Sequence, residues 1–358
     1  MRFIHIADVH LGAVPDSGCP WSASREKEIW EAFQKVVALV KKENIDLLLI
    51  AGDLFHRQPL LRQLREINYL FSGIPKTQVV WMAGNHDYMK EDSAYRKIQW
   101  AENVHGFFSQ KPEVIYLSRL HTWVYGLSYE QREITERLYD SIRPNGKQGY
   151  HILLAHGGDE KHIPFGKEIA DGFTYVALGH IHKPQVIIPD RMVYAGSLEP
   201  LEKNDVGARG LVYGQITGGV WDADTPGADV KIQTGFVPMA YRSYLPLEIA
   251  IHSGTTQLGL EQKIREAIEQ KGRKNIYLIR LKGFRNPDME FEKEPLYKLG
   301  NVVEIKDDTR PCYDLEKLKK QQEGTLIGEY IRSFDGKEGA VEQKALYYGL
   351  QALMEPEL

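Results

Sequence analysis

The sequence predicts an α/β protein, a layered β-sandwich flanked by helices, with a small α+β module and a helical C-terminal tail behind it. In the first two-thirds of the chain, continuous apolar segments of strand length alternate with helical segments, which is typical of strands covered on both faces. After about residue 238, an alternating strand, a helical stripe and another strand form a separate pattern. From residue 314 onward the pattern is helical and charged.

The first elements form a β-α-β unit. Residues 2 to 7 are an apolar strand, residues 25 to 43 an amphipathic helix and residues 45 to 51 a buried strand. The helix has one apolar face, made of Ile29, Phe33, Val36, Val37 and Val40. The rhythm continues with a helix near residues 60 to 72, a strand at 78 to 83, a short helix after Ser93, and strands at 122 to 127, 151 to 155 and 174 to 179. We therefore expect a first domain at residues 1 to 238.

A second, small domain is expected at residues 239 to 308. Its first strand, Tyr244 to Ile251, alternates apolar and polar residues, a helix carries Leu258, Ile264 and Ile268 as a stripe, and residues 276 to 282 form another strand. The tail, residues 309 to 358, has apolar residues at helical spacing. They are Leu318, Leu326, Ile327, Ile331, Val341, Leu346, Leu350 and Leu353.

The composition indicates a soluble, globular protein. Apolar residues make up 42% of the 358 residues, enough for a large core. No apolar stretch approaches the ~20 residues of a membrane helix, and the N-terminus reads as a strand rather than a secretory signal. We therefore expect a cytoplasmic protein without a membrane span.

Cys19 and Cys312 belong to no Cys-x-x-Cys pair, which predicts two free thiols. Because the net charge is -4, any contact with nucleic acid must be local.

Five clusters of potential metal ligands recur in fixed order, each where a predicted strand ends in a loop. They are Asp8 with His10, Asp53 with His56, Asn85-His86-Asp87, His156, and His180 with His182. Hard divalent cations bind carboxylate, amide and imidazole groups, and a two-metal site needs one ligand, usually a carboxylate, that bridges both ions. Asp53 is the expected bridge, because it follows a buried strand and Gly52 at the carboxyl edge of the sheet. His86 differs in kind, because it lies beside a ligand but is expected to donate a proton to a leaving oxygen or to stabilise developing charge.

Each cluster, taken singly, also fits a structural interpretation. An Asp-x-His pair at a strand end can be a solvated pair or a cap, and Gly84-Asn85-His86-Asp87 can be a turn before a capped helix. The ordered set, with every member at a strand end, favours the metal site.

Together the clusters resemble the signature of the calcineurin-like metallophosphoesterases, D-x-H, G-D-x-x-H, G-N-H-D, H and G-H-x-H in that order. Within that superfamily, Gly52 to His56 and Tyr194 to Ser197 resemble the SbcD-type, Mre-eleven-like DNA double-strand-break repair nucleases. The resemblance covers residues 1 to 215, and the module at 239 to 300 matches the family's capping domain in order and pattern. It implies the calcineurin-like fold with a capping domain.

The resemblance also implies roles for individual residues. One metal would be held by Asp8, His10, Asp53 and His182, and the other by Asp53, Asn85, His156 and His180. His86 would be the catalytic histidine, and His56, Asp87, Ser197 and Arg209 would lie near the site without being ligands. After the Gly-Ser segment the family often has Glu and then Gly-x-His-Gly, whereas this chain has Asp205 and then Gly207-Ala208-Arg209-Gly210. Arg209 is expected to touch phosphate or, as the favoured alternative, to be a solvated surface residue.

The expected reaction is phosphodiester hydrolysis with two divalent cations. Manganese suits the mixed oxygen and nitrogen ligands better than magnesium, and iron or zinc stay open. The resemblance implies a DNA repair exonuclease or endonuclease subunit that acts with an SbcC-type ABC ATPase with coiled coils. Two alternatives stay open: a small-molecule or cyclic-nucleotide phosphodiesterase of the same superfamily, and a DNA-end-binding subunit with weak catalysis.

Three surface features allow two interpretations each. The stretch Lys271-Gly272-Arg273-Lys274 fits a phosphate contact or a solvated helix end. The tail fits a helical contact with the ATPase or packing onto the catalytic domain. The resemblance implies a homodimer, and one apolar face fits either that role or packing on the sheet. This face is formed by Leu60, Leu61, Leu64, Ile67 and Leu70.

Overall fold

The computed structural model describes residues 1–219, 229–337 and 339–354. The chain divides into two units, Met1–Leu245 and Pro246–Leu358. No helix among the described residues is long and apolar enough to cross a membrane.

Among the described residues, the first sheet of unit 1 has the strand order β12-β11-β1-β2-β3-β4. Its parallel part consists of β1 (Arg2–Ile6), β2 (Leu47–Ala51), β3 (Gln78–Met82) and β4 (Val104–Gly106). The helices α1 (Ser22–Lys42) and α2 (Leu61–Ser72) connect the first three strands, as the β-α-β pattern predicts. Two long strands, β11 (Gly210–Thr217) and β12 (Lys231–Pro238), extend the sheet in antiparallel orientation beyond β1.

The second sheet of unit 1 has the order β5-β6-β7-β8-β10-β9. Its parallel part is β6 (Thr122–Gly126), β7 (Tyr150–His156), β8 (Tyr175–Gly179) and β10 (Met192–Tyr194). The edge strands β5 (Glu113–Leu117) and β9 (Gln185–Ile188) are antiparallel to their neighbours. Short 3-10 helices lie between the strands: η1 (Ala94–Arg96), which is the predicted helix after Ser93, η2 (Ser118–Leu120), η3 (Leu138–Ser141) and η4 (Lys167–Ala170).

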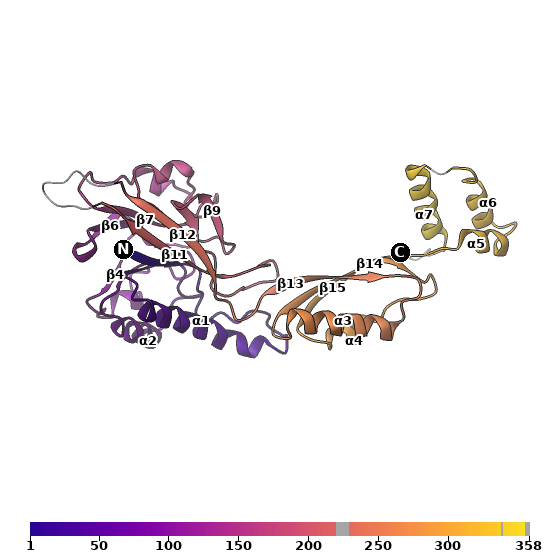
Figure 1. Cartoon of the computed structure of the whole chain (residues 1–358), viewed down its shortest axis with the longest axis horizontal. Coiled ribbons are helices and arrows are strands. Elements are labelled where there is room, and N and C mark those ends of the chain that lie inside the picture. The colour runs from indigo at the N-terminus through magenta and orange to yellow at the C-terminus, as the bar shows by residue number, and fades with distance from the viewer. Residues whose placement is uncertain (220–228, 338, 355–358) are drawn as a thin grey trace. The chain divides into compact units, whose positions relative to one another are not determined.

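The two sheets pack face to face, and this explains why their strands are continuously apolar. In β2, Leu47, Leu49 and Ala51 point into the core between the sheets, while Leu48 and Ile50 point to the core under α1 and α2. Both helices lie on the outer face of the first sheet (Figure 1). Successive residues of a strand face opposite sides of its sheet, so a strand with two covered faces needs apolar residues throughout. The predicted layered α/β fold is confirmed.

Helix α2 packs on the first sheet through its apolar face, for which the sequence allowed either this packing or a dimer contact. Leu64 and Ile67 are fully buried in the core under this helix, and Leu70 packs against that core. Leu60, which precedes the helix, is 54% exposed. Most of this face is therefore occupied within the chain.

A buried charge network holds the last segment of unit 1. Arg242 donates through Nε to Glu28 on α1 (2.8 Å), and Arg25 Nη1 donates to the same carboxylate (2.7 Å). Glu199 lies against Arg25 (3.5 Å) and accepts from the backbone N–H of Tyr241. Because removing one partner of a buried pair leaves an uncompensated charge, this network fixes the segment before Leu245 to the first unit.

Unit 2 contains a small α+β module with the strand order β13-β14-β15. The strand β13 (Tyr244–Ile251) begins at the end of unit 1 and is followed by α3 (Gln257–Lys271), β14 (Ile276–Arg285), α4 (Lys293–Tyr297) and β15 (Val302–Pro311). Helix α3 buries the predicted Ile264 and Ile268, together with Leu260, while Leu258 is 76% exposed. The stretch after α3 is exposed, and Arg273 pairs with Glu269 on the last turns of the helix.

The tail forms three helices with a small core of their own. These are α5 (Leu315–Gln321), α6 (Leu326–Arg332) and α7 (Ala340–Met354). The buried residues of this core are Ile331, Leu346 and Leu350. Two of the predicted apolar residues are largely exposed: Leu326 is 72% exposed and Val341 75%. Residues 309 to 311 belong to β15, so the helical part begins at Leu315.

Candidate two-metal centre

Loops that follow five parallel strands meet at one edge of unit 1. Three follow β1, β2 and β3 of the first sheet, and two follow β7 and β8 of the second. Backbone hydrogen bonds connect them, because Asp8 N–H donates to Gly52 O (3.2 Å) and His10 N–H to Asp53 O (3.0 Å). The carboxyl edge of a parallel sheet is the usual place for a site in an α/β fold. Every predicted ligand lies here: Asp8, His10, Asp53, Asn85, His156, His180 and His182.

Four of the predicted ligands have a left-handed backbone. Their φ angles are 49° for Asp8, 51° for His10, 50° for Asp53 and 95° for His180. Positive φ is uncommon outside glycine, and each such residue costs about 1–3 kcal/mol and persists only where the surrounding structure enforces it. Their concentration at one edge of the sheets indicates a functional constraint on the loops.

The first ligand group gathers around His10. Its Nε2 lies 3.2 Å from His182 Nε2 and 3.7 Å from Asp53 Oδ2. Ligand atoms of Asp8, His10 and His182 all lie within 4.8 Å of one another. Both carboxylate oxygens of Asp8 also accept from the backbone N–H of His180, each at 3.0 Å, which orients this carboxylate.

The second ligand group gathers around Asn85. Its Oδ1 lies 2.9 Å from His156 Nε2 and 3.2 Å from His180 Nδ1. Asp53 Oδ2 lies 3.5 Å from the same His156 nitrogen. Since Asp53 Oδ2 also faces His10, this one carboxylate lies between the two groups, where a bridging ligand is required.

The distances fit divalent cations. Metal–nitrogen and metal–oxygen bonds of ~2.0–2.2 Å put neighbouring ligand atoms about 3 Å apart on one ion. The His10–His182 and Asn85–His156 separations, 3.2 and 2.9 Å, have this size. Two imidazole nitrogens that face each other repel unless a proton or a cation lies between them. The residues present therefore suit a pair of divalent ions.

Three of the four ligand histidines have a backbone or carboxylate partner at their second ring nitrogen. His156 Nδ1–H donates to Ala51 O (2.9 Å), and His180 Nε2–H donates to Asp159 Oδ2 (2.7 Å). His182 Nδ1 faces Asp205 Oδ2 at 3.5 Å. Such partners fix which nitrogen is left for the metal and raise its basicity. The motif analysis missed the role of Asp159, although it directly follows His156-Gly157-Gly158.

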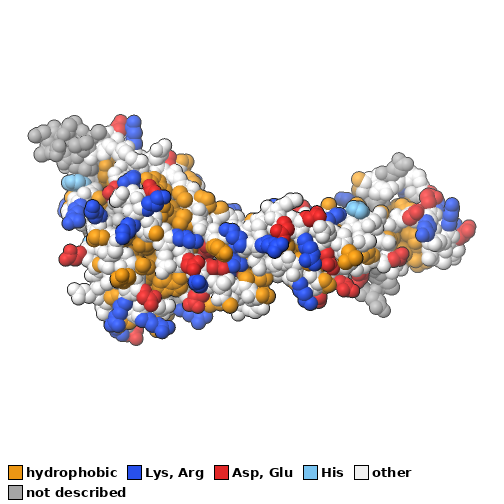
Figure 2. Space-filling view, turned by 60° about the horizontal axis from the view of Figure 1, so that its bottom comes forward, with side chains coloured by type: hydrophobic (Ala, Val, Ile, Leu, Met, Phe, Trp, Pro, Cys, Tyr) orange, Lys and Arg blue, Asp and Glu red, His pale blue; other side chains and the backbone are white. Residues whose placement is uncertain are grey.

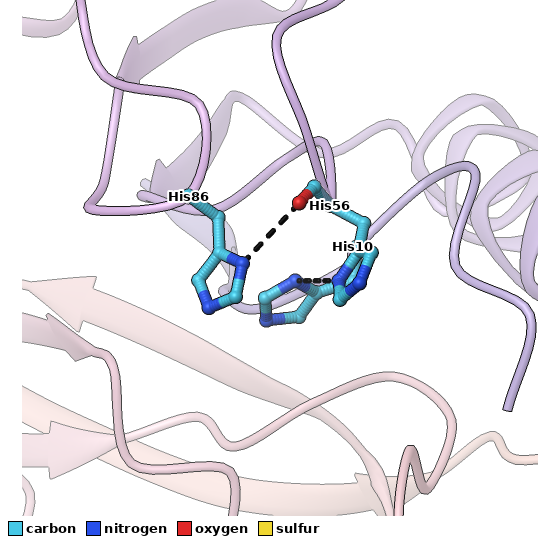
Figure 3. Close-up of side chains that lie close together, drawn as sticks. All are labelled: His10, His56 and His86. Atoms are coloured by element: carbon cyan, nitrogen blue, oxygen red, sulfur yellow. Dashed lines mark hydrogen bonds between the residues drawn. The ribbon is translucent and has the colours of Figure 1, made fainter. Parts of the chain in front are cut away.

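His86 lies beside the ligand groups and is held by two hydrogen bonds. Its backbone N–H donates to Asp53 Oδ1 (2.9 Å), and its ring Nδ1–H donates to His56 O (3.2 Å), which leaves Nε2 for another partner. Figure 3 shows His86 and His56 beside His10, whose Nδ1 lies 3.3 Å from His56 Nδ1. Atoms of these three histidines also lie within 4.8 Å of one another, so proximity alone does not separate a ligand from a proton donor here.

Asp87 and Ser197 form hydrogen bonds with the loops that carry the ligands. Asp87 accepts from the backbone N–H groups of Gly84 (2.9 Å) and Phe55 (3.1 Å) and so joins two ligand loops. Ser197 contacts the His182 loop through its backbone, because its N–H donates to His182 O (3.0 Å).

Arg209 is not the solvated surface residue that the sequence favoured. It is 2% exposed, and its Nη2 donates to Asp205 Oδ1 (3.2 Å). Asp205 in turn faces His182, so Arg209 acts on the site through that carboxylate. Residues 205 to 210 have no periodic pattern that would predict this burial.

The electrostatics of the site centre on Asp53 and His156. Burial lowers the pKa of His10 well below its usual value and the pKa of His180 to about 4, which keeps both rings neutral. Burial also acts to lower the pKa of His156, but the Asp53 carboxylate outweighs it and raises this pKa to about 9. Burial opposes ionisation of Asp53, yet His156 holds its pKa below the usual range. A cation bound here would take the place of the His156 proton, because metal ligands bind in their deprotonated form.

Comparison with known proteins gives one family match. Residues 1–184, slightly more than half of the chain, match the family described as calcineurin-like phosphoesterase.

Several relatives are similar at low identity. The chain is 28% identical over 242 residues to a Bacillus subtilis protein named uncharacterized metallophosphoesterase YhaO, in an alignment that covers 61% of this chain and 58% of that protein. It is 29% identical over 226 residues to a Methanopyrus kandleri protein named DNA double-strand break repair protein Mre11, with 56% and 49% covered. An Archaeoglobus fulgidus protein of the same name is 24% identical over 379 residues, with 97% and 83% covered. This chain thus spans about half the length of the first two relatives.

Proposed function

This chain belongs to the calcineurin-like phosphoesterase family, and we propose that it is a two-metal-dependent phosphodiesterase that cleaves DNA. The family match confirms the predicted enzyme class, a metal-dependent phosphoesterase. The observation that carries the proposal is the convergence of two ligand groups on Asp53 Oδ2, which lies 3.7 Å from His10 and 3.5 Å from His156. A single carboxylate between two such groups is the arrangement that a bridged ion pair requires.

In this proposal each ion has its own ligands and shares Asp53. Asp8, His10 and His182 complete one site, and Asn85, His156 and His180 complete the other. When bound, the two ions would stabilise phosphoryl charge and lower the pKa of a nucleophilic water. Manganese is the proposed metal, because the set mixes carboxylate, amide and imidazole groups.

His86 is the proposed proton donor to the leaving oxygen. Its Nδ1–H is engaged by His56 O, so Nε2 is the ring nitrogen available for substrate, and it donates to the leaving oxygen when the ring carries a proton on both nitrogens. The backbone N–H of His86 donates to Asp53, and this bond positions the ring relative to the bridging carboxylate. A positioned proton donor of this kind contributes about 10²- to 10⁴-fold to the rate.

DNA is the proposed substrate because two of the similar proteins are named DNA double-strand break repair proteins. Residues 1 to 238 would be the nuclease domain, 239 to 308 a capping domain and 309 to 358 a partner-binding tail. Charged side chains of both signs are intermixed on the face shown in Figure 2, so binding to phosphates would depend on local groups near the site.

Substrate comparison tests this proposal. Manganese-dependent cleavage of linear duplex DNA is measured beside hydrolysis of bis(4-nitrophenyl) phosphate and a cyclic nucleotide by the same preparation. We expect all DNA cleavage to require the divalent ion and to exceed cyclic-nucleotide hydrolysis in kcat/KM. Efficient hydrolysis of the cyclic nucleotide without DNA cleavage would assign the chain to the small-molecule phosphodiesterases instead.

An SbcC-type ABC ATPase is the proposed partner of the tail. Leu326 and Val341 are largely exposed and offer apolar anchors of the kind that helical contacts use. In co-purification with the cognate ATPase, the Leu326→Ser/Val341→Ser variant is expected to lose binding while retaining cleavage of short DNA. Unchanged binding would exclude this surface as the contact.

A further inference from the structure

A second hollow opens beside the metal centre. It has a volume of about 400 Å³, and its lining includes Arg57 and Arg132 together with His56 and His86. The other described residues that line it are neutral, and none of them is Asp or Glu. The hollow over the metal ligands is larger, about 640 Å³, and includes acidic residues. Arg132, Asn85 and His86 line both, so the two hollows adjoin at the proposed proton donor.

The two arginines are not neutralised by acidic neighbours. The carboxylates on either side of Arg132 in the sequence pair elsewhere: Glu130 with Arg96 (3.9 Å) and Glu133 with Lys161 (3.8 Å). Within the described residues neither Arg57 nor Arg132 takes part in an ion pair. A hollow with two unpaired guanidinium groups and no carboxylate favours an anion, and guanidinium forms paired hydrogen bonds with phosphate oxygens.

Both arginines extend from backbone that is held in place. Next to Arg57, the N–H of His56 donates to Leu11 O (3.1 Å), and Gln58 Nε2 donates to Tyr88 O (2.8 Å). On the other side of the hollow, Ile134 is fully buried, and its N–H donates to Lys161 O (2.8 Å). The backbone at Arg57 and Arg132 is thus held in place, while both side chains extend into solvent.

We propose that this hollow is a second phosphate subsite, in which Arg57 and Arg132 bind the phosphate next to the scissile one. The subsite adjoins His86, the proposed donor to the leaving oxygen, so the bound phosphate belongs to the leaving nucleotide. The inference rests on the proposed function, because a polynucleotide brings a second phosphate and a simple phosphodiester does not. It makes the site selective for nucleic acid without any contact to a base.

The test uses Arg57→Gln, Arg132→Gln and the double variant of the full chain. Arg119→Gln is the matched control, because Arg119 is an exposed arginine of the same unit that lines a separate hollow without predicted site residues. Each variant is assayed with manganese on a short oligonucleotide and on bis(4-nitrophenyl) phosphate, which has one phosphate. Binding of the same oligonucleotide is followed by fluorescence anisotropy in EDTA over a range of salt concentrations.

Each single variant is expected to raise KM for the oligonucleotide about tenfold, the size of a lost charge-assisted phosphate contact. The kcat and KM for bis(4-nitrophenyl) phosphate should stay unchanged. The slope of the logarithm of the DNA-binding constant against the logarithm of salt concentration should become less steep by about one unit per arginine. Equal losses on both substrates, or no loss on either, would overturn the subsite while leaving the nuclease proposal intact. Failure of the wild-type chain to cleave any oligonucleotide while it hydrolyses the small diester would overturn both.

Discussion

At the scale of single residues, the chemistry of the site depends on which atom of each side chain remains free. Ala51 O engages His156 Nδ1, and Asp159 engages His180 Nε2, so the remaining nitrogens face Asn85. In His86 the engaged atom is Nδ1, which donates to His56 O, so Nε2 is the nitrogen left for another partner. His86 lines the hollow over the metal ligands.

This assignment predicts the behaviour of His86→Ala. The variant should bind both metals, because every proposed ligand remains, while kcat falls by roughly 10²- to 10⁴-fold through loss of the proton donor. Elemental analysis and steady-state kinetics give the two readouts. The control is His105→Ala, which removes a half-buried histidine that bonds Gln78 outside the site and should leave kcat unchanged. Loss of metal from the His86 variant would instead make His86 a ligand.

The structure brings the predicted ligands together at one edge of the sheets, whereas the sequence did not indicate the residues that orient them. Asp53 and His156 could be proposed as ligands because they belong to an ordered set of clusters at strand ends, Asp53 just after β2 and His156 as the last residue of β7. Asp159, which orients His180, comes from a loop without periodicity. Arg209 was misjudged because its segment, residues 205 to 210, has no periodic pattern that indicates burial.

At the scale of elements, the ligand loops pass one another at distances that exclude side chains. A Cβ atom added at Gly84 would lie 2.3 Å from Asp53 Oδ1, and one added at Gly179 would lie 1.8 Å from Ala51 O. Glycines before the ligands are thus needed for close approach between β2, β3 and β8.

The parallel strands with long apolar runs were predictable from the sequence. The strands β4 and β10 have three residues each and are too short to show a period.

Gly84→Ala is therefore expected to disturb the bridging carboxylate. We expect weaker manganese binding, lower activity and a loss of about 1–3 kcal/mol in the free energy of unfolding, as for other overpacked sites. The matched control is Gly235→Ala on β12, where an added Cβ meets nothing within 4 Å. Calorimetric metal titration and urea unfolding compare the two. If both variants bind manganese like the wild type, the close packing around Asp53 has no role in the site.

At the scale of the whole molecule, unit 1 depends on the contact between its two sheets. His5 on β1 lies in that contact, fully buried, with its Nδ1 at 3.0 Å from the hydroxyl of Tyr175 on β8. Burial lowers the pKa of His5 to about 3. The sequence predicted β1 as an apolar strand but could not predict which face meets the second sheet.

His5 should make the stability of the chain depend on pH. Above pH ~6.5 the ring is neutral in both states and has no effect. As the pH falls from ~6.5 towards 3, the unfolded chain binds a proton that the folded chain excludes, so stability falls by up to about 1.4 kcal/mol per pH unit. Urea unfolding in EDTA at pH 7.5 and 5.5 should show a smaller loss for His5→Gln than for the wild type. Equal losses would mean that His5 titrates alike in both states.

The central claim is that Asp53 bridges two divalent ions, and the most direct test is the manganese content of wild-type and Asp53→Asn protein. Calorimetry and elemental analysis should find two ions per wild-type chain. The variant should bind fewer and lose nuclease activity, because a neutral amide of the same shape bridges two cations poorly. Circular dichroism should show that it remains folded. An Asp53→Asn protein that keeps two ions and cleaves DNA at the wild-type rate would contradict the claim.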